Sequence, residues 1–415
     1  MEEVRKKGQA AKAASRVLCT VSSVLKNRAL AAMAEEIVSA EDEILSANEL
    51  DIAAGRDKGL SAALIDRLTL TPARIRGMAE GLAVLQDLPD PIGEVISMWK
   101  RPNGLRIGQV RVPLGVVGII YEARPNVTVD AAALALKAGN AVILKGGSEA
   151  INPNKAIVAA LRRALVAVRL PEGSVDLIED TSREAATALM RLSEYLDVLI
   201  PRGGAGLIRA IMENATVPVI QTGVGNCHTY VDGSADQDMA RRIVVNAKCS
   251  RPGVCNACET LLVDASIAAA FVPEVVSDLT AGGVEVRGCP RVKSLCSQVK
   301  LASVEDWRTE YLDYIIAVKT VAGIDEAINH INKYGTHHSE AIITSDYAHA
   351  QRFLEEVDAA AVYVNASTRF TDGFEYGFGA EMGISTQKLH ARGPMGLKEL
   401  TTIKYIVYGN GQVRE

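Results

Sequence analysis

Apolar and polar residues alternate along the chain with two different periods. Over residues 1–90, apolar residues recur every three or four positions in alanine-rich stretches such as LAAMAEEIVSAEDEIL. This spacing predicts amphipathic α-helices that each bury one face against a core. Over residues 93–113 the period shortens to two on either side of Pro102, Asn103 and Gly104. That pattern predicts a projecting β-hairpin.

Between residues 115 and 221, short apolar runs of strand type alternate with helical stretches. The runs are GVVGIIY, AVILK, VDLI, DVLI and VPVI, and the stretches between them are VDAAALALKAG, NPNKAIVAALRRALVAV, SREAATALMRL and GAGLIRAIMENA. This alternation predicts right-handed βαβ units in a doubly wound parallel sheet, which binds ligands at the carboxyl ends of its strands. A second α/β segment follows over residues 227–362, and IKYIVYG near the C-terminus reads as another strand.

Two glycine-rich loops follow strands of the first sheet. KGGSEA (145–150) and PRGGAG (201–206) each place glycines and a cation where a helix begins. Such loops favour a phosphate-bearing ligand, and ordinary tight turns are the alternative. The fingerprints of Rossmann dinucleotide sites, P-loop kinases, serine hydrolases and zinc proteases are absent from the sequence.

Cys255 is the candidate nucleophile. It lies in NAKCSRPGVCNACETLLV (246–263), where a polar loop meets an apolar, strand-like run. A thiol at such a junction can meet a ligand while its backbone is held rigid, and a thiolate attacks an activated acyl carbon readily. The alternatives are a small buried hydrophobic residue, or a zinc ligand together with Cys258. Zinc is disfavoured because no compact fourth ligand accompanies Cys249.

Composition excludes several classes of function. A net charge of −5 and an aromatic content of 4% argue against binding of nucleic acids. No stretch approaches ~18 uninterrupted apolar residues, so we expect no membrane span. Seven cysteines, an odd number, and an N-terminus without an apolar signal region favour a reducing, cytoplasmic compartment.

Several motifs together resemble one family. They are YEARPNVTVDAAALALKAGNAVILKGGSEA, IPRGGAGLIRAI, TGVGNCHTYVD, RPGVCNACETLLV, VAGIDEAINHINKYGTHHSEAI, YVNASTRFTDG and GISTQKLHARGPMGL. Through them the whole chain resembles the gamma-glutamyl phosphate reductases (glutamate-5-semialdehyde dehydrogenases) of the aldehyde dehydrogenase superfamily. The resemblance implies an NADPH-dependent reduction of the acyl phosphate L-glutamyl 5-phosphate to L-glutamate 5-semialdehyde and phosphate, in proline biosynthesis.

The resemblance also implies the catalytic residues. Cys255 would displace phosphate to give a thioester, which a nicotinamide hydride reduces to a thiohemiacetal that expels the aldehyde. The side-chain amide of Asn126 and the backbone N–H of Cys255 would hold the negative oxygen. The alternative for Asn126 is a turn or cap residue after Pro125.

By resemblance, six residues hold the cofactor: Lys145, Ser148, Glu149, Arg202, Gly203 and Glu310. Glu310 aligns with the glutamate that binds the nicotinamide ribose. The family implies NADPH, although the residues alone leave NADH open, because Lys145 suits a 2′-phosphate and Glu149 a 2′-hydroxyl. The candidate anion contacts for the substrate are Arg124, Lys137, Arg251, His338 and Arg369, of which we expect two or three to touch it. Buried ion pairs are the alternative for each, and no metal site is predicted.

Two departures from the family pattern qualify this interpretation. The glutamate with which hydrolytic aldehyde dehydrogenases activate water falls on Thr222 or Gly223, so no carboxylate stands there. A reductase should lack that base, because hydrolysis would waste the thioester. Gln221 and Ser250 replace a glutamate and a glutamine, and either change could weaken activity or alter substrate handling.

We therefore expect an α/β, aldehyde dehydrogenase-like protein with four parts. They are an NADP-binding domain (1–92 and 114–226), a catalytic domain carrying Cys255 (227–362), an oligomerisation hairpin and strand (93–113 and 400–415) and a return segment that closes the active site (363–399). A homo-oligomer is expected, and direct transfer from glutamate 5-kinase is an expectation because glutamyl phosphate cyclises easily. Alternatives with the same fold are an acyl-CoA-dependent or oxidising aldehyde dehydrogenase, or a non-catalytic scaffold.

Overall fold

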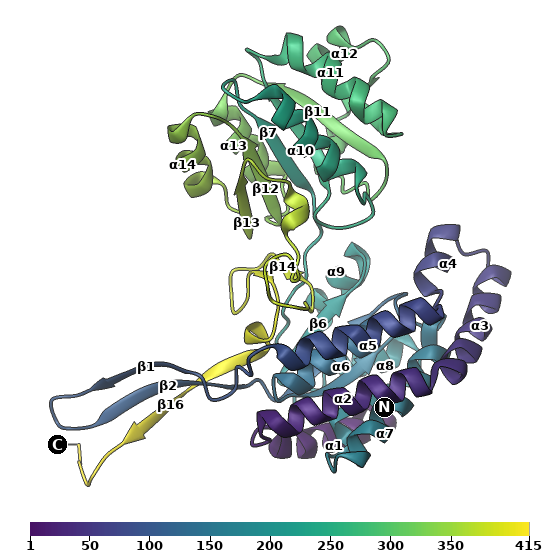
Figure 1. Ribbon diagram of the computed structural model, residues 1–415, viewed down its shortest axis with the longest axis vertical. Helices are drawn as coiled ribbons and strands as arrows, with labels where there is room; N and C mark the ends of the chain where they lie inside the picture. The colour runs from purple at the N-terminus through teal and green to yellow at the C-terminus, as the bar shows by residue number, and fades with distance from the viewer. Residues whose placement is uncertain (415) are drawn as a thin grey trace. The chain divides into compact units, whose positions relative to one another are not determined.

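The computed structural model describes residues 1–414, which form two compact units. Unit 1 comprises residues 1–221, 377–383 and 395–415, and unit 2 comprises residues 222–376 and 384–394. Within each unit the strands and helices alternate as the apolar pattern predicts, so the predicted α/β class is observed (Figure 1).

Unit 1 begins with the predicted amphipathic helices. They are α1 (Glu2–Leu18), α2 (Ser23–Ser39), α3 (Glu41–Asp57), α4 (Ala62–Leu68) and α5 (Pro72–Asp87). Helix α5 illustrates the local rules: the Thr71 hydroxyl accepts a hydrogen bond from the Arg74 N–H, and Pro72 occupies the first turn. Its buried side chains recur at three- to four-residue spacing, which places them on one face (Ile75, Met78, Leu82 and Leu85).

The sheet of unit 1 has four strands in the order β5-β4-β3-β6. The strands are all parallel: β3 (Val116–Tyr121), β4 (Ala141–Lys145), β5 (Val175–Leu177) and β6 (Val198–Arg202). Each strand is followed in the chain by one α-helix, in the order α6 (Asn126–Lys137), α7 (Ile151–Ala167), α8 (Arg183–Met190) and α9 (Ala205–Asn214). The prediction of a strand over VPVI was wrong. It makes only an isolated bridge between Leu199 and Val219, and Pro218 supplies no N–H to extend a ladder.

The hairpin predicted over residues 93–113 is present as β1 (Val95–Lys100) and β2 (Arg106–Pro113). Strand β16 (Thr401–Tyr408) pairs antiparallel with β2 along its whole length, so β2 is the central strand of three (Figure 1). The turn places Gly104 in the left-handed region, with φ of 89°. The role of this element in oligomerisation stays a prediction.

Unit 2 is built on a seven-stranded parallel sheet in the order β10-β9-β11-β8-β7-β12-β13. Its strands are β7 (Cys227–Val231), β8 (Cys258–Asp264), β9 (Glu285–Gly288), β10 (Lys300–Leu301), β11 (Ile315–Val321), β12 (Ser339–Ile343) and β13 (Ala361–Val364). Its helices are α10 (Gln237–Cys249), α11 (Ala268–Ala281), α12 (Pro290–Leu295), α13 (Ile324–Tyr334) and α14 (Tyr347–Glu356), and a short antiparallel pair joins β14 (Ile384–Ser385) to β15 (Gly393–Pro394).

Two apolar cores cover the two faces of this sheet. Leu261 and Val263 of β8 pack in the core with residues of α10 and α11, whereas Leu262 packs in the core with residues of α13 and α14. The alternation follows from the two-residue period of a strand. Strands buried on both faces leave only their ends free for chemistry.

Candidate active site

Cys255 lies at the amino edge of the sheet of unit 2. It lies in the loop that leads into β8, just as Gly225 lies before β7, Glu310 before β11 and His338 before β12. Because these strands are parallel, the four preceding loops meet at one edge of the sheet. Unit 2 therefore gathers its candidate residues at the amino ends of its strands, whereas the candidate loops of unit 1 follow theirs.

The loop that carries the candidate nucleophile Cys255 (residues 250–257, here the nucleophile loop) is held by its backbone, while Cys255 itself is half-buried. A Cβ at Gly225 would lie 1.5 Å from the carbonyl oxygen of Cys255, so only glycine fits there. The same carbonyl accepts a hydrogen bond from the thiol of Cys227, with a sulfur–oxygen distance of 3.2 Å. The Asn256 amide donates to the carbonyl of Thr371 (3.0 Å). No local pattern predicts a role for Asn256, since its partners lie more than 100 residues away.

Two of the five candidate anion contacts, Arg251 and Arg369, lie in or beside this loop. Arg369 donates from Nε to the Ser250 hydroxyl at 3.2 Å and from Nη1 to Asn256 Oδ1. Burial and the charge of Arg251 lower the pKa of Arg369, while Asp372 and Cys255 act in the opposite direction. Arg369 therefore interacts electrostatically with both Arg251 and Cys255. Ser250, a departure from the family pattern, serves here as an acceptor for Arg369.

His338 has no exposed surface. Its Nδ1 lies 2.8 Å from the Ser339 hydroxyl and 3.7 Å from the Cys227 sulfur. Burial lowers the pKa of His338 to about 4, so the ring is neutral near pH 7. Its contact with a substrate anion stays a prediction.

Glu310 is half-buried and accepts a hydrogen bond from the Gly225 N–H at 2.7 Å. Burial raises its pKa, while the Gly225 N–H and the charge of Lys248 lower it. Glu310 is thus tied to the residue that packs against the Cys255 carbonyl.

In unit 1 the two glycine loops and the segment after β3 are bonded to one another. The Glu149 carboxylate accepts from the Ala123 N–H at 2.7 Å, and the Glu122 carboxylate accepts from the Gly204 N–H at 2.9 Å. A Cβ at Gly203 would lie 2.5 Å from Glu122 Oε2, so any larger residue there would have to displace the Glu122 carboxylate. The loops lie at the carboxyl ends of β3, β4 and β6, where the strand order reverses, and that position suits a dinucleotide.

The other cofactor and anion candidates of unit 1 share this edge. Lys145 is buried, donates to the Gly146 carbonyl at 3.2 Å and has its pKa lowered by burial. Ser148 begins a 3₁₀ turn, Arg202 closes β6, and Arg124 is half-buried after β3. Lys137 is instead used inside the fold, where it donates to the Asn27 side chain at 2.7 Å.

Asn126 begins helix α6, and its exposed side-chain amide donates to Asp130 Oδ2 at 3.1 Å. Burial raises the pKa of Asp130 to about 6, against the lowering effect of Asn126 and Arg202. Sequence reasoning missed Asp130, although its four-residue spacing from Asn126 on one helix was a usable signal.

No carboxylate occupies the position of the hydrolytic base. Thr222 is buried, and the Gly223 N–H donates to the Ile384 carbonyl at 2.9 Å. A Cβ at Gly223 would stand 2.2 Å from the methyl carbon of Thr386. A side chain therefore cannot be added at Gly223 without displacing Thr386.

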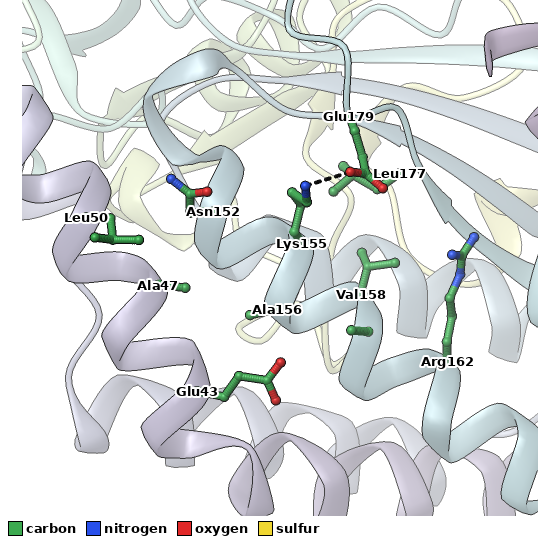
Figure 2. Close-up of a pocket in the computed structure, with 11 residues that line it drawn as sticks. Glu43, Ala47, Leu50, Asn152, Lys155, Ala156, Val158, Arg162, Leu177 and Glu179 are labelled. Atoms are coloured by element: carbon green, nitrogen blue, oxygen red, sulfur yellow. Dashed lines mark ion pairs between the residues drawn. The ribbon is translucent and has the colours of Figure 1, made fainter. Parts of the chain in front are cut away.

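A cavity of about 440 Å³ lies between α3 and α7 in unit 1 (Figure 2). Glu43, Ala47 and Leu50 face Lys155, which forms an ion pair with Glu179 at 2.7 Å. None of the predicted site residues lines this cavity, so we assign it no part in the reaction.

Within the described residues, the seven cysteines are free thiols, and no cluster of three or more histidine, cysteine or acidic side chains is arranged to hold a metal. Burial raises the pKa of the Cys258 thiol to about 12. Over the same residues, no helix has both the length and the apolar character of a membrane span.

Comparison with known proteins gives the family. Residues 1–307 and 302–406 match the model of the aldehyde dehydrogenase family. The gamma-glutamyl phosphate reductases of Heliobacterium modesticaldum and Clostridium beijerinckii are both 64% identical to the chain, over 99% and 100% of both sequences, respectively. A crystal structure of the gamma-glutamyl phosphate reductase from Thermotoga maritima superimposes with a TM-score of 0.98, at 52% identity, over 100% of both chains.

The chain belongs to the gamma-glutamyl phosphate reductases of the aldehyde dehydrogenase family. This confirms the predicted aldehyde dehydrogenase-like fold and the assignment as an oxidoreductase. Membership in the aldehyde dehydrogenase family implies a nicotinamide cofactor. The binding of its phosphates by the glycine loops of unit 1 stays a prediction.

Proposed function

We propose that this chain reduces L-glutamyl 5-phosphate to L-glutamate 5-semialdehyde and phosphate with NADPH, through a thioester on Cys255. The observation that carries the proposal is the half-buried thiol on a rigidly held loop, next to Arg251 and Arg369. A free carboxylate resists hydride because it is already anionic, whereas an acyl phosphate offers an electrophilic carbon and a good leaving group. The reaction therefore requires a nucleophile and cations, and both are present.

The residues of the chain take separate parts in this reaction. Cys255 Sγ bonds to the acyl carbon as the bond from that carbon to the phosphate oxygen breaks. Arg251 and Arg369 attract the phosphate and the carboxylate of the substrate. The backbone N–H of Cys255 and the amide of Asn126 are proposed to stabilise the negative oxygen. The nicotinamide, when bound, supplies the hydride that converts the thioester to a thiohemiacetal, whose C–S bond then breaks to release the aldehyde and the thiolate.

The surroundings of Gly223 support reduction rather than hydrolysis. With no room for a side chain at Gly223 and with Thr222 buried, neither position offers a base to activate water. A thioester on Cys255 is thereby protected until hydride arrives.

The choice of NADPH over NADH rests on Lys145 and Glu149. One Glu149 oxygen is already bonded to the Ala123 N–H, while Lys145 supplies a positive charge in the same loop. A cation in this position favours a 2′-phosphate. We expect the Lys145→Met variant to have a lower ratio of kcat/KM for NADPH to kcat/KM for NADH than the parent, and that result would support this choice.

An assay in the reverse direction tests the reaction. Protein supplied with the semialdehyde, phosphate and NADP should produce the absorbance of reduced nicotinamide, and production should stop without phosphate. Activity with coenzyme A in place of phosphate would indicate an acyl-CoA-dependent enzyme, and activity with neither would indicate a hydrolytic dehydrogenase. Cys255→Ser should abolish turnover and leave cofactor binding intact, and retained turnover would remove Cys255 from the mechanism.

We also propose that the three-stranded sheet binds a second copy of the chain. All six residues of β1 are exposed, and exposed apolar side chains are found on both outer strands of the sheet. Those of β1 are Val95, Ile96, Met98 and Trp99, and those of β16 are Ile403, Tyr405, Val407 and Tyr408. Such a surface is rarely left open to water. Light scattering should give the mass of an oligomer for the parent and a smaller mass for Trp99→Glu/Tyr405→Glu. Cytoplasmic location and contact with glutamate 5-kinase remain proposals from the resemblance.

A further inference from the structure

Lys248 and Glu259 form an ion pair across the base of the nucleophile loop. Lys248 lies in the last turn of α10 and Glu259 in β8, so the pair joins the two ends of the loop that carries Cys255. Lys248 Nζ and Glu259 Oε2 are 2.5 Å apart, and neither side chain is exposed. Taking two charges out of water is costly, and apolar pairs often fold equally well in such positions. Stability alone is therefore a weak reason for this pair.

The second carboxylate oxygen of Glu259 points to another role. Glu259 Oε1 accepts a hydrogen bond from the backbone N–H of Leu312 at 3.2 Å. Leu312 adopts a left-handed conformation with φ of 54°, which a leucine rarely takes without support. Two residues earlier, Glu310 is bonded to the Gly225 N–H. The segment 310–312 is thus fixed at one end by Gly225 and at the other by Glu259.

Tyr311 completes the attachment of this segment. Its ring centre lies 5.9 Å from Lys248 Nζ, and its hydroxyl donates to Asp306 Oδ1 at 2.7 Å. The buried ion pair therefore contacts two consecutive residues that follow Glu310.

We propose that Glu259, with Lys248 as its counter-ion, is a positioning residue that holds Glu310 in place for the cofactor. The inference rests on the function proposed above, because it takes Glu310 to bind the nicotinamide ribose. Since Glu259 also lies on the strand that follows the nucleophile, one carboxylate fixes both the Cys255 loop and the cofactor-binding glutamate. Neither Lys248 nor Glu259 touches the reacting atoms.

Two paired variants separate the hydrogen bond from the charges. Lys248→Met/Glu259→Gln removes both charges and keeps a side-chain oxygen for the Leu312 N–H, whereas Lys248→Met/Glu259→Met removes the oxygen as well. We expect the Gln pair to keep the KM for NADPH within about threefold of the parent. We expect the Met pair to raise this KM about tenfold, the effect of losing one hydrogen bond, here the one from the Leu312 N–H to Glu259. An unchanged KM in the Met pair would overturn the proposal.

A double-mutant cycle tests whether Glu259 acts through Glu310. In a Glu310→Gln background, the Met pair should raise the KM for NADPH no further, because the positioned carboxylate is already absent. Effects that multiply would mean that Glu259 acts elsewhere and would overturn the proposal. If Glu310→Gln alone leaves the KM unchanged, both ideas fall, and the assignment of Glu310 to the cofactor is identified as the error.

The buried pair of Lys26 and Asp90 in unit 1 supplies a matched control. Lys26 Nζ lies 2.9 Å from Asp90 Oδ2, and Asp90 Oδ1 accepts from the Ile92 N–H at 2.9 Å, as Glu259 does from Leu312. Lys26→Met/Asp90→Leu should shift the melting temperature and leave the KM for NADPH unchanged. A tenfold rise here as well would attribute the effect to general loss of stability and would overturn the proposal.

Discussion

The carbonyl oxygen of Cys255 lies where a β-carbon would stand if position 225 were any residue other than glycine, with only 1.5 Å between the two points. Because no side chain fits at position 225, the observed backbone position of the loop that carries Cys255 requires glycine there. The same glycine donates its N–H to Glu310, so a change at Gly225 should disturb Cys255 and Glu310 together.

We predict that Gly225→Ala lowers kcat/KM about a hundredfold, because a misplacement of about 1 Å at reacting atoms has an effect of this size. Gly77→Ala is the control, since nothing lies within 4 Å of its Cβ in helix α5. That variant should gain about 0.5–1 kcal/mol of stability and keep full activity. Steady-state kinetics measure kcat/KM of the two variants, and urea unfolding measures their stability. A Gly225→Ala enzyme with the kcat/KM of the parent would contradict this prediction.

At Gly223 the obstacle is one side chain, which makes it removable. Gly223→Ala should cost about 1–3 kcal/mol of stability, since its Cβ would meet the Thr386 methyl and hydroxyl at 2.2 and 2.9 Å. Adding Thr386→Ala removes both atoms and should recover most of the loss. Thermal unfolding of the two variants decides the matter, and equal melting temperatures would show that Thr386 is not the obstacle.

Asp130 should make the protein less stable at neutral than at acidic pH. Its folded pKa of about 6 exceeds the ordinary value of about 3.9, so the native state retains a proton that the unfolded chain has lost between these pH values. Stability therefore falls as pH rises through this window, by up to about 3 kcal/mol. Asp130→Asn should be more stable than the parent at pH 7 and equal to it near pH 4, as followed by urea unfolding.

His338 should act in the opposite direction. Because its folded pKa of about 4 lies below the ordinary value near 6.5, the unfolded chain binds the extra proton, and stability is lost as pH falls from 6.5 to 4. The loss is up to about 3 kcal/mol. His338→Asn should flatten this part of the profile, and a profile with unchanged slope would indicate that the ring is charged in the native state.

Sequence reasoning succeeded where local pattern decides the structure. Apolar runs such as AVILK became buried parallel strands, and the turn at Gly104 became a hairpin, because burial and left-handed backbone leave a signal within a few residues. The prediction of a strand over VPVI was wrong because its apolar residues suggest a strand whether or not Pro218 is among them. Pro218 has no N–H to continue a hydrogen-bonded ladder, so only an isolated bridge forms.

The sequence proposed candidate site residues but not the contacts that support them. Cys255 and Glu310 were proposed from motifs, and their catalytic and cofactor-binding roles stay predictions, while the structure brings their loops to one edge of a sheet. The contact of Glu259 with Leu312 joins positions 53 residues apart through a backbone N–H, and neither periodicity nor composition records such a bond.

The pairing of β16 with β2 has a consequence for biosynthesis. Strand β2 emerges from the ribosome long before residues 401–408, with all of unit 2 translated in between. Until then one edge of the hairpin lacks its neighbour and exposes unpaired peptide groups. The nascent protein therefore carries an unpaired strand edge through most of its translation. Chaperones that bind extended segments should bind the hairpin at this edge.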